Sequence, residues 1–147
     1  MPRKARIKSQ QHIYHAILLG INKQQIFYEE SDFRNFEKEI KKNKPVILAL
    51  HVPIEPVTGD KALIQKCDEI YGKNASKKYQ LIMGQNGRVP NHITQKFIDL
   101  ALSEDSPVIM VLAGHLHFYH RDMLNDKIVQ IVTGPAYSGE ALKITVK

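Results

Sequence analysis

The sequence has little that would suit an oxidising or membrane setting. Its 147 residues include one cysteine, Cys67, so no disulfide can form within the chain. No apolar run approaches the roughly 20 residues that a helix needs to span a bilayer. The basic start is followed by no apolar segment of signal-peptide length and by no small-residue cleavage site. These absences predict a cytoplasmic chain without a membrane partner.

The composition is typical of a soluble globular protein, with 43% hydrophobic and 24% charged residues. This length is enough for one domain with a real core. There is no internal repeat and no low-complexity tract. The formal net charge is +6, which favours an anionic partner. Much of the excess positive charge lies in two clusters: Arg3, Lys4, Arg6 and Lys8, and Lys41, Lys42 and Lys44.

The most informative stretch is an apolar run that ends in two histidines. Residues 108–113 read Val-Ile-Met-Val-Leu-Ala and are followed by Gly114, His115, Leu116 and His117. An uninterrupted apolar run of this length predicts a buried strand, and glycine allows the backbone to turn at its end. Open α/β sheets usually hold ligands at the carboxyl ends of their strands. Two neutral imidazoles placed there suit zinc, manganese or iron.

The remaining pattern predicts an α/β fold in which strands and helices are interspersed. Strands are expected over residues 12–19, 46–50, 108–113, 118–123, 127–132 and 141–146. A first helix is expected over residues 33–40, after an N-cap at Ser31 or Asp32. Two further helices are expected over residues 61–71 and 95–103, the latter capped by Asn91 or Thr94.

Three segments together resemble the C-terminal half of the calcineurin-like metallophosphoesterases, over about residues 37–147. Residues 44–54 contain a strand that ends in His51, and residues 114–117 are similar to that family's last metal-binding motif. Residues 127–139 resemble its closing strand and Gly-rich turn. The resemblance implies a partial metallophosphoesterase-like sheet and metal-dependent phosphoester hydrolysis. It also implies that His51 and His115 share one divalent metal (manganese, iron or zinc) and that His117 faces a second.

The front-half motifs of that family do not occur in this sequence. These are an Asp-x-His, a Gly-Asp pair that supplies a bridging aspartate, and an Asn-His that supplies a metal ligand and a catalytic acid. The one Gly-Asp pair, Gly59-Asp60, follows His51 and is interpreted as a turn. Without a bridging carboxylate two neighbouring cations would repel each other, so a single partial metal site is expected and no catalytic residue is assigned. The absent strands would leave an exposed sheet edge that favours self-association, unless the strand at residues 12–19 covers it.

Residues 1–40 resemble the N-terminal region of the single-tyrosine transposases that act on repetitive extragenic palindromes and related insertion elements. The resemblance is carried by residues 1–6, Ser9, and residues 13–15, 20–23 and 26–27. This leader implies DNA as a second partner, bound by Arg3, Lys4, Arg6 and Lys8. The same family binds one metal through a His-hydrophobic-His triplet beside a tyrosine nucleophile. His115-Leu-His117, with Tyr119 or Tyr137, therefore has a second interpretation.

The sequence predicts two regions, a transposase-like strand-helix leader at residues 1–40 and a partial metallophosphoesterase-like domain at residues 41–147. Three functions stay open: metal-dependent phosphoester hydrolysis, residual or completed in a dimer; DNA binding; and an inactive fusion product. The other histidines are expected to have surface or structural roles: His12, His15, His92 and His120.

Overall fold

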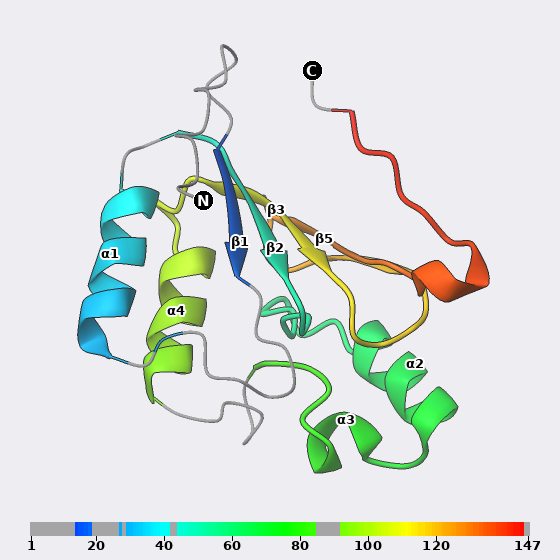
Figure 1. Ribbon diagram of the computed structural model, residues 1–147. Helices are drawn as coiled ribbons and strands as arrows, with labels where there is room; N and C mark the ends of the chain where they lie inside the picture. Colours follow the sequence, from blue (N-terminus) through cyan, green and yellow to red (C-terminus); the bar gives the residue numbers. More distant parts are fainter. Residues whose placement is uncertain (1–13, 19–26, 28, 42–43, 85–91, 146–147) are drawn as a thin grey trace, which may run out of the picture.

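A computed structural model describes residues 14–18, 27, 29–41, 44–84 and 92–145, which form a five-stranded mixed sheet with flanking helices (Figure 1). The sheet order is β1-β2-β3-β5-β4. β1, β2, β3 and β5 are mutually parallel, and β4 pairs antiparallel with β5. The strands are β1 (Tyr14–Leu18), β2 (Val46–Leu50), β3 (Val108–Ala113), β4 (His120–Met123) and β5 (Val129–Val132).

Most of the expected strands are confirmed, but one is wrong. The expected strand at residues 141–146 does not form over residues 141–145, which lie within the described part of the chain. After β5 the chain enters a short 3-10 turn, η1 (Ala136–Ser138), and Gly139 then adopts a left-handed φ of 81°. This turn ends the pairing with β3, and the side chains of residues 141–143 are exposed. A strand without a partner is not stable.

The loop between β4 and β5 explains why β5 is shorter than expected. Asn125 Oδ1 accepts hydrogen bonds from the backbone N–H groups of Lys127 and Ile128, at 3.1 and 2.9 Å. These two residues therefore belong to an Asx-type turn and not to the strand. The ammonium group of Lys127 also donates to the carbonyl oxygens of Glu104 and Ser106. The turn is thus tied to the segment that leads into β3.

The helices are α1 (Glu30–Ile40), α2 (Ala62–Tyr71), α3 (Ala75–Lys78) and α4 (His92–Leu102). The expected N-caps Ser31 and Asp32 of α1 are wrong, and so is Thr94 for α4. Glu29 caps α1, and its N–H donates to Asp32 Oδ2 at 3.2 Å, so Ser31 and Asp32 lie inside the first turn of the helix. Thr94 lies inside α4, and Asn91 is outside the described residues. Among the described residues, no helix is long and apolar enough to cross a membrane.

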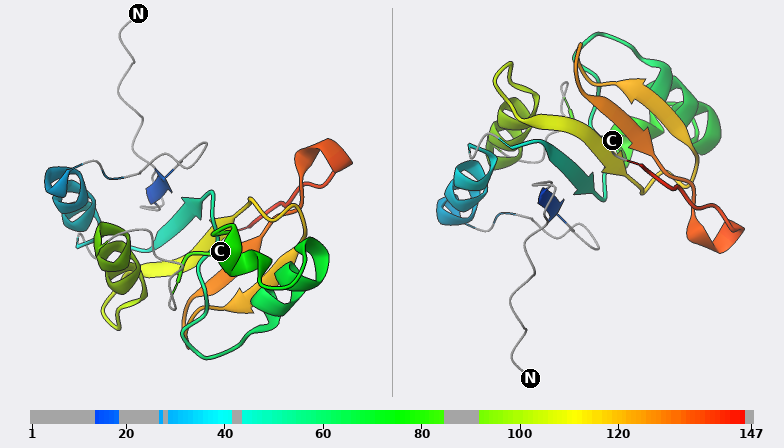
Figure 2. Two further views of the ribbon diagram at one scale, coloured as in Figure 1. Left: turned by 90° about the horizontal axis from the view of Figure 1, so that it is seen from below. Right: turned by 90° about the horizontal axis from the view of Figure 1, so that it is seen from above.

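Two clusters of buried side chains hold the helices to the sheet. The larger one joins α1 and α4 to β2 and β3, and within it Phe36 of α1 packs on Phe97 of α4 with ring centroids 5.3 Å apart. The smaller one joins α2 to the ends of β3 and β5 through Leu63, Cys67 and Leu116. Figure 2 shows that α1 stays beside α4, and α2 beside α3, in both further views. In Figure 1, α2 and α3 lie beyond the carboxyl ends of β2 and β3.

The leader strand and the rest of the chain share one sheet. β1 pairs in parallel with β2, in a register that runs from Tyr14↔Val46 to Leu18↔Leu50. The edge of β2 is therefore covered by β1, as the sequence suggested. The described sheet ends instead at β1 and at the short antiparallel strand β4.

Candidate metal centre

His51 and His115 lie together because two neighbouring parallel strands end side by side. The register pairs Leu50 of β2 with Ala113 of β3, and each histidine follows within two residues. The backbone N–H of Gly114 donates to the carbonyl oxygen of His51 at 3.2 Å, which fixes the two ends to each other. The ring nitrogens His115 Nδ1 and His51 Nε2 are 3.0 Å apart, and the ring centroids are 4.7 Å apart. The predicted meeting of these two imidazoles is therefore present.

The turn that carries the histidine pair is tight and has a left-handed backbone. His115 and His117 have φ values of 66° and 49°, a region that residues with a side chain rarely adopt. Between them, Leu116 is 1% exposed and packs in the smaller core cluster. Its N–H donates to Gly114 O at 2.7 Å, and its carbonyl oxygen accepts from the Tyr71 hydroxyl at 2.5 Å. Burial of Leu116 therefore holds a strained turn that leaves both flanking histidines less buried.

His117 lies at the exposed rim of this turn. Its Nδ1 is 3.4 Å from the Tyr137 hydroxyl oxygen, and the two rings meet edge to face with centroids 5.7 Å apart. Tyr137 is itself 81% exposed and belongs to η1. The structure thus brings together His51 and His115 in direct contact, with His117 and Tyr137 as a second contacting pair.

The electrostatics of the cluster favour the neutral form of His115. Burial lowers the pKa of His115 below its ordinary value, and the charges of His51 and His117 lower it further. A neutral imidazole is the form that binds a metal, whereas a protonated one cannot. Near neutral pH His115 is therefore in the form that can bind a metal.

Imidazole nitrogens are suitable ligands for a divalent metal, but the cluster does not yet hold a complete set of ligands in position. The two facing nitrogens are 3.0 Å apart, against about 3.3 Å for two ligands on one tetrahedral zinc. Within the described residues, no three His, Cys, Asp or Glu side chains already lie where one metal ion could be held. His51 and His115 would supply two donors, and His117 would have to turn inward to supply the third.

Several other predicted residues stand apart from this cluster. Arg3, Lys4, Arg6 and Lys8 are outside the described residues. His92 is exposed at the start of α4, and Tyr119 is 50% exposed. Asp60 lies in a turn, as expected, where its Oδ1 accepts from the N–H of Ala62 at 2.9 Å.

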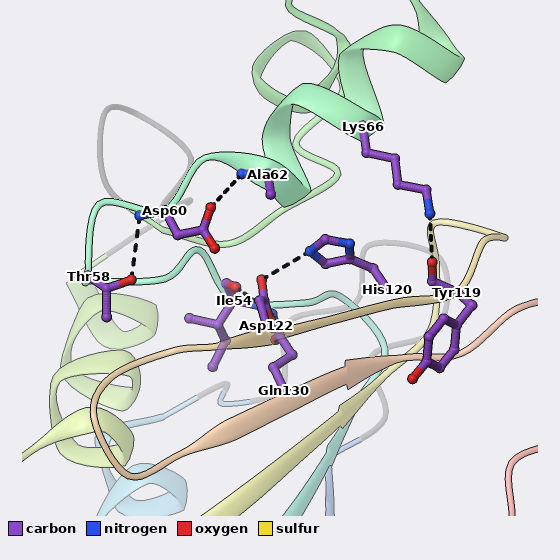
Figure 3. A network of polar contacts seen from close by, with 9 residues as sticks. All are labelled: Ile54, Thr58, Asp60, Ala62, Lys66, Tyr119, His120, Asp122 and Gln130. Atoms are coloured by element: carbon purple, nitrogen blue, oxygen red, sulfur yellow. Dashed lines mark hydrogen bonds and ion pairs between the residues drawn. The ribbon is translucent and has the colours of Figure 1, made fainter.

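Sequence reasoning missed a buried polar network next to β4, shown in Figure 3. Gln130 is fully buried, and its side chain exchanges two hydrogen bonds with the backbone of Ile54, each 2.8 Å long. It also donates to Asp122 Oδ1 at 3.2 Å, and His120 lies beside Asp122. The available signal was strand alternation, which puts Gln130 on the same face as the buried Val132.

No protein-family model matches the chain, and no curated protein matches it. The resemblances to metallophosphoesterases and to transposases therefore stay predictions, and the site rests on its own geometry.

Proposed function

We propose that this chain binds one divalent metal ion through His51, His115 and His117 and hydrolyses phosphoesters with it, as a partial metallophosphoesterase-like protein. The observation that carries the proposal is the 3.0 Å approach of two imidazole nitrogens from different strands, at the carboxyl edge of a parallel sheet. The backbone hydrogen bond from Gly114 N–H to His51 O holds the two strand ends together before any ligand arrives.

The residues of the turn have distinct roles in this proposal. His51 and His115 hold the metal, and the low pKa of His115 keeps that ring free of a competing proton. The bound metal supplies a Lewis acid that polarises a phosphoryl oxygen. His117 would turn inward as the third ligand, and Tyr137 stands at the exposed rim, where its O–H donor can reach a remaining phosphate oxygen. No bridging carboxylate accompanies the cluster in the described residues, so the proposal is limited to one metal.

The test compares metal binding and hydrolysis in matched variants. We expect His51→Gln and His115→Gln each to weaken Mn²⁺ or Zn²⁺ binding by at least tenfold in calorimetry, because each removes one of two facing donors. Hydrolysis of an aryl phosphate under Mn²⁺ should fall in parallel. His92→Gln is the control, since His92 is exposed on α4. Unchanged binding in both site variants would refute the metal centre, and metal binding without hydrolysis would refute only the enzymatic part.

A second candidate function rests on the contact between Tyr137 and His117. A tyrosine hydroxyl 3.4 Å from an imidazole nitrogen can pass its proton to that ring and attack a DNA phosphate, so that a phosphotyrosine bond forms while the P–O bond to the adjoining sugar breaks and the sugar oxygen leaves as a hydroxyl. In that case Tyr137→Phe should abolish covalent attachment of the protein to a single-stranded DNA substrate, and Tyr119→Phe should not. Deleting residues 1–8 should reduce the salt dependence of DNA binding. If wild-type protein forms no covalent adduct, this candidate is wrong.

A further inference from the structure

A second pair of metal-type donors lies on β4. His120 and Asp122 are alternate residues of the strand and point to the same side, with side chains that are 13% and 2% exposed. His120 Nε2 and Asp122 Oδ2 are both buried, and neither has a hydrogen-bond partner among the described residues. Buried polar atoms are rarely left in this way, because each lost hydrogen bond costs free energy.

The surroundings fix the direction in which the Asp122 carboxylate points. Gln130 Nε2 donates to Asp122 Oδ1, and the other hydrogen bonds of Gln130 are directed to the backbone of Ile54. Asp122 is therefore anchored through one oxygen, and its other oxygen is directed toward His120. Burial raises the pKa of Asp122 and the charge of Asp60 raises it further, whereas the hydrogen bond from Gln130 and the charge of His120 lower it. The ion-pair contact with His120, at 3.6 Å, therefore compensates for the burial of this carboxylate only in part.

The distance between His120 Nε2 and Asp122 Oδ2 is compatible with a cation bound between them. At 3.6 Å, His120 Nε2 and Asp122 Oδ2 are too far apart for a hydrogen bond. Two ligands that bind one zinc ion at its usual distances are about 3.3–3.6 Å apart, depending on the angle between them. The gap therefore has the width that a shared cation requires, with one nitrogen donor and one carboxylate donor.

Asp60 is a third donor, near enough to Asp122 for its charge to act on that carboxyl group. One of its oxygens accepts from Ala62 N–H, and Figure 3 shows the other oxygen turned away from Ala62, on the side of β4. Asp60 is exposed, so its side chain has room to rotate, and the rotation exchanges the hydrogen bond with Ala62 N–H for a bond to the cation. Because no three donors already surround one point in the described chain, this rotation is needed to complete the shell.

We propose that His120, Asp122 and Asp60 bind a divalent cation of the zinc type, in a site separate from the histidine centre at His51 and His115. The bound ion fastens the loop before α2 to the edge strand β4. It also gives His120 a role that its position in the sequence did not suggest.

The experiment uses a double variant, His51→Gln with His115→Gln, to remove the histidine centre. Zinc is titrated by calorimetry, and the imidazole nitrogens are followed by NMR. We expect the double variant to keep about one equivalent of zinc and to shift the Nε2 resonance of His120. Adding Asp60→Asn should weaken this binding at least tenfold, whereas Asp126→Asn, in the exposed β4–β5 turn, should leave it unchanged. Asp122→Asn should abolish it in a variant that remains folded by circular dichroism.

Two results would overturn the proposal. One is a double variant that binds no zinc, with a His120 resonance that responds only to pH, as a simple buried His–Asp ion pair would. The other is zinc binding that is unaffected by Asp60→Asn and by His120→Gln, which would place the ion on other side chains. Asp60 is exposed, so its variant remains informative even if Asp122→Asn fails to fold.

Discussion

Replacing Gln130 with methionine tests whether one buried amide holds the loop after β2 against the sheet. Gln130 Oε1 accepts from Ile54 N–H, and Gln130 Nε2 donates to Ile54 O, each over 2.8 Å. The side chain thus acts as a strand partner for a residue 76 positions away. Ile54 also forms an isolated bridge with Met83. Methionine has nearly the same length and volume, so Gln130→Met removes the hydrogen bonds with little change in packing.

The expected loss follows from the groups left behind. Ile54 is fully buried, so its N–H and C=O would both lose a partner without gaining water. Each unsatisfied buried group costs about 1–3 kcal/mol, which gives about 2–6 kcal/mol for the two. A domain of this kind is stable by about 5–15 kcal/mol in total. Gln130→Met should therefore remove a large fraction of the stability, and Asp122 would lose a donor in addition.

Urea unfolding followed by circular dichroism measures the effect. Gln95→Met is the control, because Gln95 bonds only to the Asp99 side chain on the surface of α4, and its change should stay within about 0.5 kcal/mol. Gln130→Glu should also destabilise at neutral pH, since it loses the donor and brings a second carboxylate near Asp122. A loss below about 1 kcal/mol for Gln130→Met would refute the reasoning.

Two further substitutions test the packing around the site. Tyr71→Phe removes the hydrogen bond to Leu116 O and should cost about 0.5–1.5 kcal/mol at pH 7 in urea unfolding. Burial raises the pKa of Tyr71, so the folded state keeps the hydroxyl proton to a higher pH than the unfolded chain does. The free energy of unfolding should therefore fall as pH rises above 10.0, and Tyr71→Phe should not show this contribution to the fall. Phe97→Ala should cost about 3–5 kcal/mol, because Phe97 is 1% exposed and packs on Phe27 and Phe36. A cost below about 2 kcal/mol would mean that the aromatic cluster rearranges around the gap.

The sequence predicts the parts of this fold that depend on local patterns. Residues 46–50 and 108–113 are apolar without interruption, so a buried parallel strand is the simplest prediction for both. Both strands form and are parallel, but only β2 is buried along most of its length, whereas Ile109 of β3 is 42% exposed. His51 and His115 follow those strands directly, and their meeting needs only that β2 and β3 be neighbours. That neighbour relation came from a family resemblance and not from spacing.

The parts that sequence reasoning missed depend on distant partners. Leu142 and Ile144 alternate with polar residues as a strand would, but no strand lies beside them in the described structure. Gln130 looks like an interruption in an apolar strand until Ile54 is seen opposite it. Glu29 caps α1, and its N–H donates a hydrogen bond to Asp32 Oδ2, a contact that a list of preferred capping residues does not reveal.

The turn at residues 114–117 links the packing of the chain to its proposed chemistry. Left-handed backbone at His115 and His117 costs about 1–3 kcal/mol for each residue. Burying Leu116 contributes about 1.5–3 kcal/mol, against a combined cost of about 2–6 kcal/mol for the two histidines. The hydrogen bonds from Tyr71 to Leu116 O and from Gly114 N–H to His51 O add to this stabilisation, and both act on the backbone and not on the imidazole rings. The core and these two hydrogen bonds therefore sustain the strained backbone that carries His115 and His117 on either side of Leu116.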